Sequence, residues 1–360
     1  MRSGTERQEG NRGGRAGAPV GRGWRSPVTE PCVRVCLTGA TGFLGARLLA
    51  RLASDGHAIA ALVPHGEDTT AIAARVERVV RGDVADPHAV RDAVAGAEVV
   101  FHLAGLVPAR ASHRREFERV NVVGARRVAE ATVRAGVARL VHCGTAAVYG
   151  VPQRTGTVDE RTEPRPVNAY QASKLAGEHA VAAAVAGSGT SVVLARPTAL
   201  YGAGDRATLP LLRAVARGRV RIVGDGGVPC QLTHVDDAAA LLHACAEWCL
   251  DGVSADVLLV GSEERATERS LIEIVARAAG TTPRVAVFPR APLAGAWRLQ
   301  RAIARRLHPM PGRFDGLDFF LADRTVDVSK ARRVLGVTAQ VALADGVRDA
   351  VAHARRAGLL

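Results

Sequence analysis

A tyrosine and a lysine lie one helical turn apart in the stretch NAYQASKLAGE, where they could transfer a proton. The chain has only three tyrosines and two lysines, yet Tyr170 precedes Lys174 by four residues. At this spacing two side chains share a helix face, so the ammonium can lower the phenol pKa from its ordinary value of about 10. Such a phenol can exchange a proton with an alcohol near neutral pH. An ordinary exposed pair has the same spacing, so the motif needs support from a second observation.

A glycine-rich turn upstream supplies that support. Gly39, Gly42 and Gly45 recur at intervals of three after an apolar run, and a leucine stripe typical of an amphipathic helix follows them. Such glycines permit a tight turn, close approach of backbone to a pyrophosphate, and close packing of helix on strand. The helix N-terminus would direct free N–H groups at the phosphates. The sequence therefore predicts a dinucleotide site.

Strand and helix patterns alternate through the first half of the chain. Strands are expected at 33–38, 58–63, 76–81, 98–103 and 139–144, and helices at 42–54, 69–74, 86–95, 113–135 and 168–186. This alternation predicts an α/β fold with a parallel, doubly wound sheet and right-handed crossovers. The regular pattern ends after Pro197, where glycine-rich turns begin.

The motifs, taken together and in order, resemble the extended short-chain dehydrogenases/reductases, the NAD-dependent epimerase/dehydratase type. The matching blocks are TGATGFLG (38–45), GDVAD (82–86), FHLAG (101–105), NVVGARRVAEA (121–131), HCGTAAVYG (142–150), YQASK (170–174), RPTALYGAGD (196–205) and THVDDAA (233–239). The resemblance spans roughly residues 32–350. It implies an NAD(P)-binding Rossmann domain over 31–197 and a smaller, mainly substrate-binding α/β lobe over 198–360, with segments around 228–260 returning to the Rossmann domain.

The same resemblance implies roles for individual residues. Tyr170 would be the general acid/base, Lys174 would lower its pKa and hold the nicotinamide ribose, and Thr145 would hydrogen-bond the reacting oxygen. The residues expected to contact the cofactor are Gly39, Thr41, Gly42, Phe43, Leu44, Gly45, His65, Asp83, Val84, Leu103, Ala104, Gly105, Asn121, Lys174 and Pro197.

Three of these residues have specific expected contacts. Asp83 would recognise the adenine amino group, Asn121 would steady the catalytic site, and Pro197 would lie near the nicotinamide carboxamide. Asp83 and Asn121 could equally be a turn residue and a helix cap, since both residue types favour such positions.

Composition limits the other classes of function. The net charge is +13, and 46 of the 48 basic residues are arginine. The arginines are spread along the chain, aromatic residues make up only 4%, and no recognised nucleic-acid module appears, so nucleic-acid binding is not expected. Six cysteines in a chain of this size predict reduced thiols in a cytoplasmic protein rather than a disulfide framework. Eleven histidines without ligand spacing give no metal site.

Two segments stand apart from this pattern. Residues 1–30 are rich in glycine and arginine without hydrophobic periodicity, which predicts disorder. Residues 291–307 form an amphipathic pattern with arginines on one face. Such a helix can lie on a membrane surface, but we expect its apolar side to pack on the protein's own core. No apolar run is long enough to span a bilayer.

The reaction class depends on two positions outside the Tyr/Lys motif. Nucleotide-sugar enzymes of the resembled family commonly hold a diphosphate with an asparagine and an arginine; here Ala199 stands in the first block, and Cys230 and Gln231 in the second region. A diphosphate would lose charge-assisted bonds there. The sequence thus looks closest to hydroxysteroid dehydrogenases and dihydroflavonol-type reductases, and predicts an NAD(P)-dependent oxidoreductase for an apolar or alicyclic alcohol or ketone.

Two alternatives stay open at this point. One is a nucleotide-sugar epimerase or dehydratase that uses the same Thr/Tyr/Lys site. The other is a cofactor-binding scaffold without catalysis, which is disfavoured because such members usually lose the tyrosine or the lysine.

The choice between NAD and NADP is also open. The segment where an acidic residue would bind the ribose of NAD reads ALVPHGED. Val63 and Pro64 carry no charge, Glu67 and Asp68 come late, and His65 is the residue expected to contact the cofactor. Homodimers are common in the resembled family, so a homodimer is expected.

Overall fold

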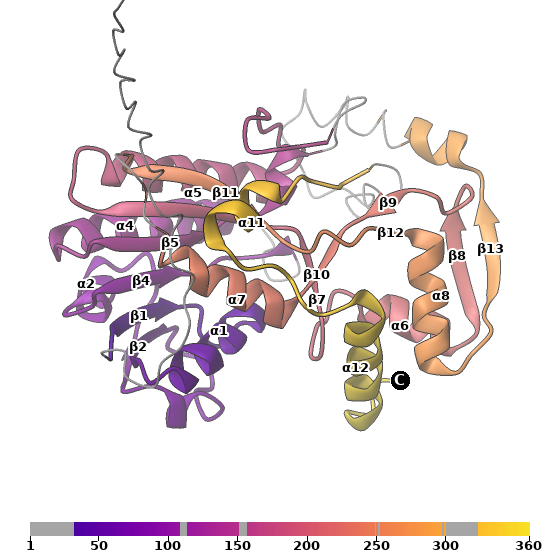
Figure 1. Ribbon diagram of the computed structural model, residues 1–360, viewed down its shortest axis with the longest axis horizontal. Coiled ribbons are helices and arrows are strands. Elements are labelled where there is room, and N and C mark those ends of the chain that lie inside the picture. The colour runs from indigo at the N-terminus through magenta and orange to yellow at the C-terminus, as the bar shows by residue number, and fades with distance from the viewer. Residues whose placement is uncertain are drawn as a thin grey trace, which may run out of the picture. The chain divides into compact units, whose positions relative to one another are not determined.

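The computed structural model describes residues 32–108, 114–150, 157–248, 250, 253–296, 299 and 323–360. Its main sheet has seven parallel strands in the order β11-β6-β5-β4-β1-β2-β3 (Figure 1). In chain order they are β1 (Arg34–Thr38), β2 (Ala58–Val63), β3 (Arg78–Arg81), β4 (Val99–His102), β5 (Arg139–Cys143), β6 (Ser191–Pro197) and β11 (Ala255–Val260). The order reverses between β1 and β4, so the predicted doubly wound parallel α/β sheet is confirmed. The predicted tail, residues 1–30, lies outside the described residues.

Helices cover both faces of this sheet because its strands are apolar on both sides. On one face α1 (Phe43–Ser54) packs beside α7 (Val235–Cys245), with Leu48 and Leu242 fully buried. On the other face lie α2 (Pro87–Val94), α4 (Ala125–Arg134) and α5 (Ala169–Val185). Strands buried on both faces are typical of parallel sheets. The result is two apolar layers that hold the carboxyl ends of β1, β4 and β5 in register.

Two predicted helices differ from the structure. The helix expected at 69–74 is only a single 3-10 turn, η1 (Ala73–Arg75). The Asp68 carboxylate accepts hydrogen bonds from the Thr70 amide and hydroxyl, which stabilises a turn instead of a helix. The long helix expected at 113–135 is described from Arg114 on, as α3 (Arg114–Phe117), the π-helical segment η3 (Glu118–Gly124) and α4. A π-helical insertion often marks a functional site.

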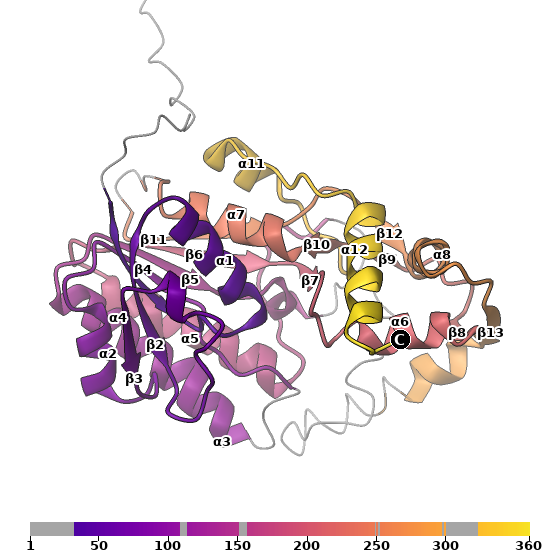
Figure 2. The same cartoon turned by 90° about the horizontal axis from the view of Figure 1, so that it is seen from below.

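The remaining elements form a second lobe beyond the carboxyl edge of the sheet (Figure 2). Helices α6 (Leu209–Ala216), α8 (Glu268–Ala279) and α12 (Leu343–Arg356) share one apolar core. Three short strand pairs accompany them: β7 (Ala199–Tyr201) with β10 (Leu232–His234), β9 (Pro229–Cys230) with β12 (Ala266–Thr267), and β8 (Arg219–Val223) with β13 (Arg284–Phe288). Between β10 and β12 the chain returns to the nucleotide lobe as α7 and β11. Within the described residues, no helix is both long and apolar enough to cross a bilayer.

Candidate active site

The glycine turn after β1 has backbone geometry that favours glycine. Gly39 has φ +79°, and a Cβ atom there would lie 2.8 Å from the Ala104 nitrogen. A Cβ atom on Gly45 would overlap the Gly39 carbonyl oxygen. These two positions bring β1, the loop after β4 and α1 into the close approach that a dinucleotide-binding turn requires.

The first turn of α1 can bind a diphosphate. The backbone N–H groups of Phe43, Leu44 and Gly45 have no acceptor within the helix, because they belong to its first turn. The N-cap residue of α1 is Gly42, which has no side chain, and no side chain of another described residue caps the helix there. The first turn of the helix contains no acidic residue. Both the helix dipole and the free donors therefore favour an anion here.

The loop after β2 places a carboxylate on the glycine turn. The Thr41 hydroxyl donates a hydrogen bond to Glu67. Arg81, at the end of β3, holds this loop by donating to the Glu67 carbonyl at 2.7 Å and to the Thr69 hydroxyl at 2.8 Å. His65, the residue that sequence analysis favours for the cofactor, is exposed and makes no hydrogen bond with another described residue. Glu67 is thus the residue that sequence reasoning misses, because the fold of the loop depends on an arginine from another strand.

Asp83 follows β3, next to the buried Val84, which packs on Gly124. One Asp83 oxygen accepts from the Ala85 amide at 2.8 Å, and the other lies 2.6 Å from the Arg119 guanidinium. Partial burial opposes ionisation, but the hydrogen bonds and the charge of Arg119 hold the pKa of Asp83 below its usual value. Asp83 is therefore a turn residue and an ion-pair partner in this structure, and its contact with adenine stays a prediction.

The backbone after β4 is fixed from β1. The Thr38 carbonyl accepts from the Leu103 amide at 3.1 Å, and the Thr38 hydroxyl accepts from the Ala104 amide at 3.1 Å. A Cβ atom on Gly105 would lie 3.3 Å from Asn121 Oδ1 and 3.5 Å from Lys174 Nζ. Gly105 therefore lies beside Lys174 and Asn121, and the contact of Leu103, Ala104 and Gly105 with the cofactor stays a prediction.

Asn121 is buried in η3 and connects this segment to α5. Its Oδ1 accepts from the Leu106 amide at 2.8 Å, while Nδ2 donates to the Leu106 carbonyl at 3.2 Å and to Ser173 Oγ at 2.9 Å. Asn121 is thus not a helix cap, because its polar atoms bind another loop and another helix. It fixes the loop after β4 against the helix that carries Tyr170.

Tyr170 lies in the first turn of α5, which begins after Asn168, whose side chain caps the helix by accepting from the Gln171 amide at 2.9 Å. The Thr145 side chain lies close enough to the Tyr170 hydroxyl to lower the pKa of that hydroxyl. Lys174 is buried one turn later, and its Nζ donates to the Cys143 carbonyl at 2.6 Å. The structure thus brings Thr145, Tyr170 and Lys174 together at the carboxyl end of β5.

The expected lowering of the Tyr170 pKa is not found in this structure. Burial and the nearby Cys143 thiol raise the pKa of Tyr170 to about 12, although the hydrogen bond from Thr145 lowers it. Burial also lowers the pKa of Lys174. The physical reason is that the Lys174 ammonium is directed at a backbone carbonyl rather than at the phenol.

Sequence analysis did not identify the buried ion pair between Arg196 and Glu178, which joins helix α5 to the sheet. Arg196, on β6 next to Pro197, donates to the Glu178 carboxylate of α5 at 3.0 and 2.6 Å and to the Tyr149 hydroxyl at 2.7 Å. Arg196 is 4% exposed and Glu178 1%. The pair joins the catalytic helix to the sheet. Its sequence signal was available, since Tyr149 and Arg196 both lie within the blocks that carry the family resemblance.

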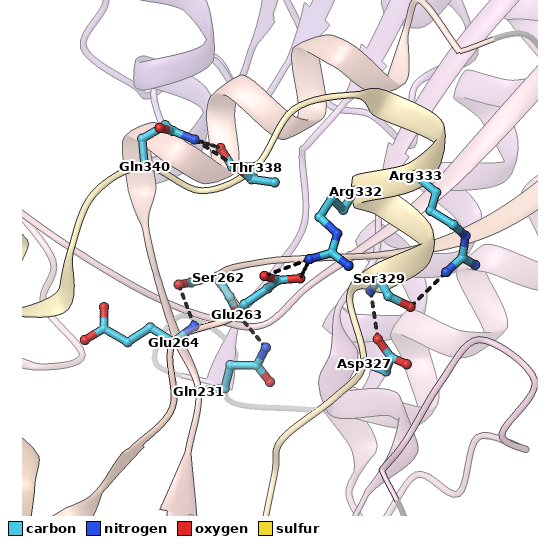
Figure 3. A network of polar contacts seen from close by, with 10 residues as sticks. All are labelled: Gln231, Ser262, Glu263, Glu264, Asp327, Ser329, Arg332, Arg333, Thr338 and Gln340. Atoms are coloured by element: carbon cyan, nitrogen blue, oxygen red, sulfur yellow. Dashed lines mark hydrogen bonds and ion pairs between the residues drawn. The ribbon is translucent and has the colours of Figure 1, made fainter. Parts of the chain in front are cut away.

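Three residues, Ala199, Cys230 and Gln231, occupy the two regions that are expected to distinguish nucleotide-sugar enzymes. Gln231 is 3% exposed, and its Nε2 donates to the Ser262 carbonyl at 2.5 Å (Figure 3). Its Oε1 accepts from the Val326 amide at 2.8 Å. Cys230 is buried as well, and Ala199 is exposed but apolar. The side chain of Gln231 therefore connects its own segment to the backbone at Ser262 and at Val326.

One cluster of potential metal ligands occurs among the described residues. Asp55, His57 and His243 have ligand atoms within 4.8 Å of one another, at the amino edge of β2, opposite to the glycine turn. However, the Arg51 guanidinium donates to His243 Nδ1 at 3.2 Å. This contact occupies the lone pair that a metal would need and adds a positive charge, so the cluster supports no metal role.

Comparison with known proteins identifies the family of the chain. A model of the NAD dependent epimerase/dehydratase family matches residues 35–261. A 4-hydroxy-2-methyl-3-oxo-4-farnesyl-3,4-dihydroquinoline-1-oxide ketoreductase from Stigmatella aurantiaca is 31% identical over 91% of this chain and 98% of its own length. A ceramide reductase from Caulobacter vibrioides is 40% identical over 58% of this chain and 60% of its own length.

Solved structures share the fold as well. MoeE5 in complex with UDP-glucose and NAD has a TM-score of 0.71 and 30% identity, and the match covers 90% of this chain and 99% of that chain. The glycine turn, the Thr145, Tyr170 and Lys174 site, and these matches agree with one another. The chain therefore belongs to the NAD-dependent epimerase/dehydratase family of NAD(P)-dependent enzymes.

Proposed function

We propose that the protein is an oxidoreductase for an alcohol or ketone on an apolar or alicyclic molecule, such as a hydroxysteroid-like or flavonol-like substrate. The observation that carries this choice is the environment of Gln231 and Ala199. Gln231 is engaged by backbone partners at both ends of its amide, and Ala199 has no polar side-chain atom. A nucleotide diphosphate would gain no charge-assisted hydrogen bond from either side chain. The relatives named for a farnesylated ketone and for ceramide support the same substrate class.

The residues of the site divide the work of the reaction. A bound nicotinamide cofactor would supply the hydride chemistry, as acceptor from the carbinol carbon in oxidation and as donor to the carbonyl carbon in reduction. Thr145 Oγ1 hydrogen-bonds the reacting oxygen, and Tyr170 Oη takes up the alcohol proton or returns it. Lys174, next to Gly105 and Asn121, would bind the ribose hydroxyls of the cofactor.

A nucleotide-sugar epimerase or dehydratase is the second candidate. It uses the same proton-transfer residues, and the likeness to MoeE5, solved with UDP-glucose and NAD, favours it. The two candidates differ in what the second lobe must bind, because only the nucleotide sugar brings a diphosphate.

A substrate panel separates the two candidates. Purified protein with NAD or NADP should oxidise or reduce steroid, flavonoid and long-chain ketone or alcohol substrates, followed by absorbance at the nicotinamide band. UDP- and dTDP-sugars should give no product by chromatography. Turnover of a nucleotide sugar together with no turnover of any apolar substrate would make the nucleotide-sugar epimerase or dehydratase the favoured function.

We also propose that the enzyme prefers NAD, because Glu67 lies on the loop after β2 and contacts the glycine turn, and the acidic residue that binds the adenosine ribose in Rossmann folds follows the same strand. A carboxylate can accept hydrogen bonds from both ribose hydroxyls, whereas it repels a 2′-phosphate. Glu67 is held there by Thr41, and Arg81 fixes its loop.

Calorimetric titration of both cofactors tests this preference without turnover. Glu67→Gln should improve the Kd for NADP relative to that for NAD by about tenfold. Asp68→Asn is the matched control, because it removes the same charge from the next residue, whose carboxylate is bound to Thr70. An unchanged ratio in Glu67→Gln, or an equal change in Asp68→Asn, would refute the assignment.

A further inference from the structure

The β8–β13 pair forms an outer edge of the second lobe (Figure 1). The two strands are parallel, with Val285 opposite Val220 and Val287 opposite Ile222. Val220 and Ile222 are buried in the core that includes α6 and α8. In contrast, every residue of β13 is exposed. Val285 and Val287 therefore lie on the same face of the pair as the buried Val220 and Ile222, while Arg284 and Phe288 lie on the opposite face.

The exposed side chains of β13 include large apolar ones. Val285 is 40% exposed, Val287 58% and Phe288 42%, and Leu299, shortly after the strand, is 63% exposed. The three residues of β13 belong to the eight large hydrophobic side chains that are exposed within the described part of the chain, and no other described strand contains any of the eight. Single exposed apolar residues are ordinary on a protein surface, but such a concentration indicates a contact site. The expectation that residues 291–307 pack on the core is wrong at Leu299, and residues 297–298 and 300–307 lie outside the described residues.

The same edge is strongly basic. Arg219 and Arg284 lie opposite each other in the strand register, and the Arg221 guanidinium lies 5.7 Å from the centre of the Phe288 ring. None of these three arginines forms an ion pair with an acidic residue in the described ranges. The sequence agrees, because between Glu273 and Asp315 it has eight arginines and no acidic residue.

We propose that this basic apolar edge, with Arg219, Arg221, Arg284 and Phe288 on one face of the strand pair and Val285 and Val287 on the other, docks on the surface of an anionic lipid bilayer. Valine and phenylalanine side chains at such an edge can enter the boundary between headgroups and acyl chains, while arginines bind lipid phosphates. A second copy of this chain fits less well, because a symmetric contact would bring the same arginines together. A nucleic acid would use the arginines but would leave the aliphatic side chains without a partner.

Docking of this kind would bring the enzyme to apolar molecules that dissolve in membranes. The proposal nevertheless stands apart from the proposed reaction, because lipid binding needs neither substrate nor cofactor. A protein that binds vesicles but fails to turn over the apolar panel would leave this proposal intact and refute the other.

Sedimentation with vesicles tests the proposal directly. The full chain should sediment with vesicles of equimolar phosphatidylcholine and phosphatidylglycerol, and at least about tenfold less with phosphatidylcholine alone. Added salt should weaken binding, because screening reduces the attraction between arginines and phosphates.

Two variants and a control locate the binding surface. Arg219→Glu with Arg284→Glu, and separately Val287→Asp with Phe288→Asp, should each weaken vesicle binding at least about tenfold. The control is Arg126→Glu with Arg134→Glu on α4, which changes the net charge equally on the nucleotide lobe and should retain most of the binding. Melting temperatures of all variants establish that they are folded.

Three results would overturn the proposal. They are no sedimentation with either vesicle, equal loss of binding in the edge variants and the α4 control, and binding of duplex DNA that is tighter than vesicle binding and equally sensitive to the edge variants.

Discussion

The nucleotide lobe and the β8–β13 pair differ in how deeply their strands are buried. Nearly every residue of β4 and β6 is buried, whereas every residue of β13 is exposed. The carboxyl ends of the buried strands lie beside the proposed active site, and the geometry of these strands is fixed by packing on both faces. The exposed strand is free of that constraint. We therefore expect substitutions in the buried strands, near the proposed active site, to be far more damaging than substitutions in β13, at the proposed docking edge.

The largest expected effect concerns the buried ion pair of the nucleotide lobe. Arg196→Met should lower the free energy of unfolding by about 3–5 kcal/mol, because it leaves the Glu178 carboxylate buried without its partner. Urea denaturation measures the change. The double variant Arg196→Met with Glu178→Met should recover much of the loss, since an apolar pair of similar volume needs no counter-charge.

An exposed pair in the second lobe provides the control for this measurement. Arg348 and Asp345 form an ion pair on α12 with side chains 65% and 60% exposed. Arg348→Met should cost less than about 1 kcal/mol, because solvent screens the pair. If Arg196→Met and Arg348→Met lower the free energy of unfolding equally, the buried pair is no more important for stability than the exposed pair.

A smaller effect is expected from a buried histidine beneath the catalytic site. Burial, together with the neighbouring His102 and Lys174, holds the pKa of His142 well below its usual value. The folded chain keeps His142 neutral, while the unfolded chain gains a proton as the pH falls below about 6.5. The stability that depends on neutral His142 is therefore present above about pH 6.5 and falls by about 2 kcal/mol on acidification to about pH 5.

His142→Phe should remove that part of the acid sensitivity, because phenylalanine is similar in size and does not titrate. Unfolding free energies of the variant and the parent protein at about pH 7.5 and about pH 5 give the comparison. If the parent and the variant lose the same stability on acidification, His142 is not the group responsible.

The smallest effect on stability is expected at the exposed strand. Val287→Ala should change the unfolding free energy by no more than about 0.5 kcal/mol, as is usual for surface substitutions. Val260→Ala, on the buried strand β11, should cost about 2 kcal/mol by the same denaturation assay, since Val260 is 1% exposed. A similar cost at both positions would show that Val287 is buried in solution.

Much of the nucleotide lobe could be predicted from the sequence, because its signals are local. The glycine spacing requires a backbone with positive φ at Gly39, and Tyr170 and Lys174 need only one helix to lie side by side. Contacts between distant segments could not be predicted. Glu67 reaches the glycine turn only because its loop is held by Arg81 from β3, and Lys174 donates to the Cys143 carbonyl on β5.

The exposed edge shows the opposite limit of sequence reasoning. An amphipathic pattern tells which side of a segment is apolar but not what that side contacts. The burial of Leu299 and β13 depends on whether another element covers them, and the packing of α6 and α8 on β8 leaves β13 uncovered. The sequence shows that the arginines between Glu273 and Asp315 have no acidic residue among them. It does not show that some of these arginines lie near exposed apolar side chains.

The most direct test of the account is the effect of Tyr170→Phe on turnover and on cofactor binding measured in the same preparation. The proposed role of the Tyr170 hydroxyl predicts loss of detectable turnover of the best substrate, while the Kd for the cofactor stays within about threefold of the parent value. A variant that keeps the parent rate would contradict the assignment of Tyr170 as the proton-transfer residue.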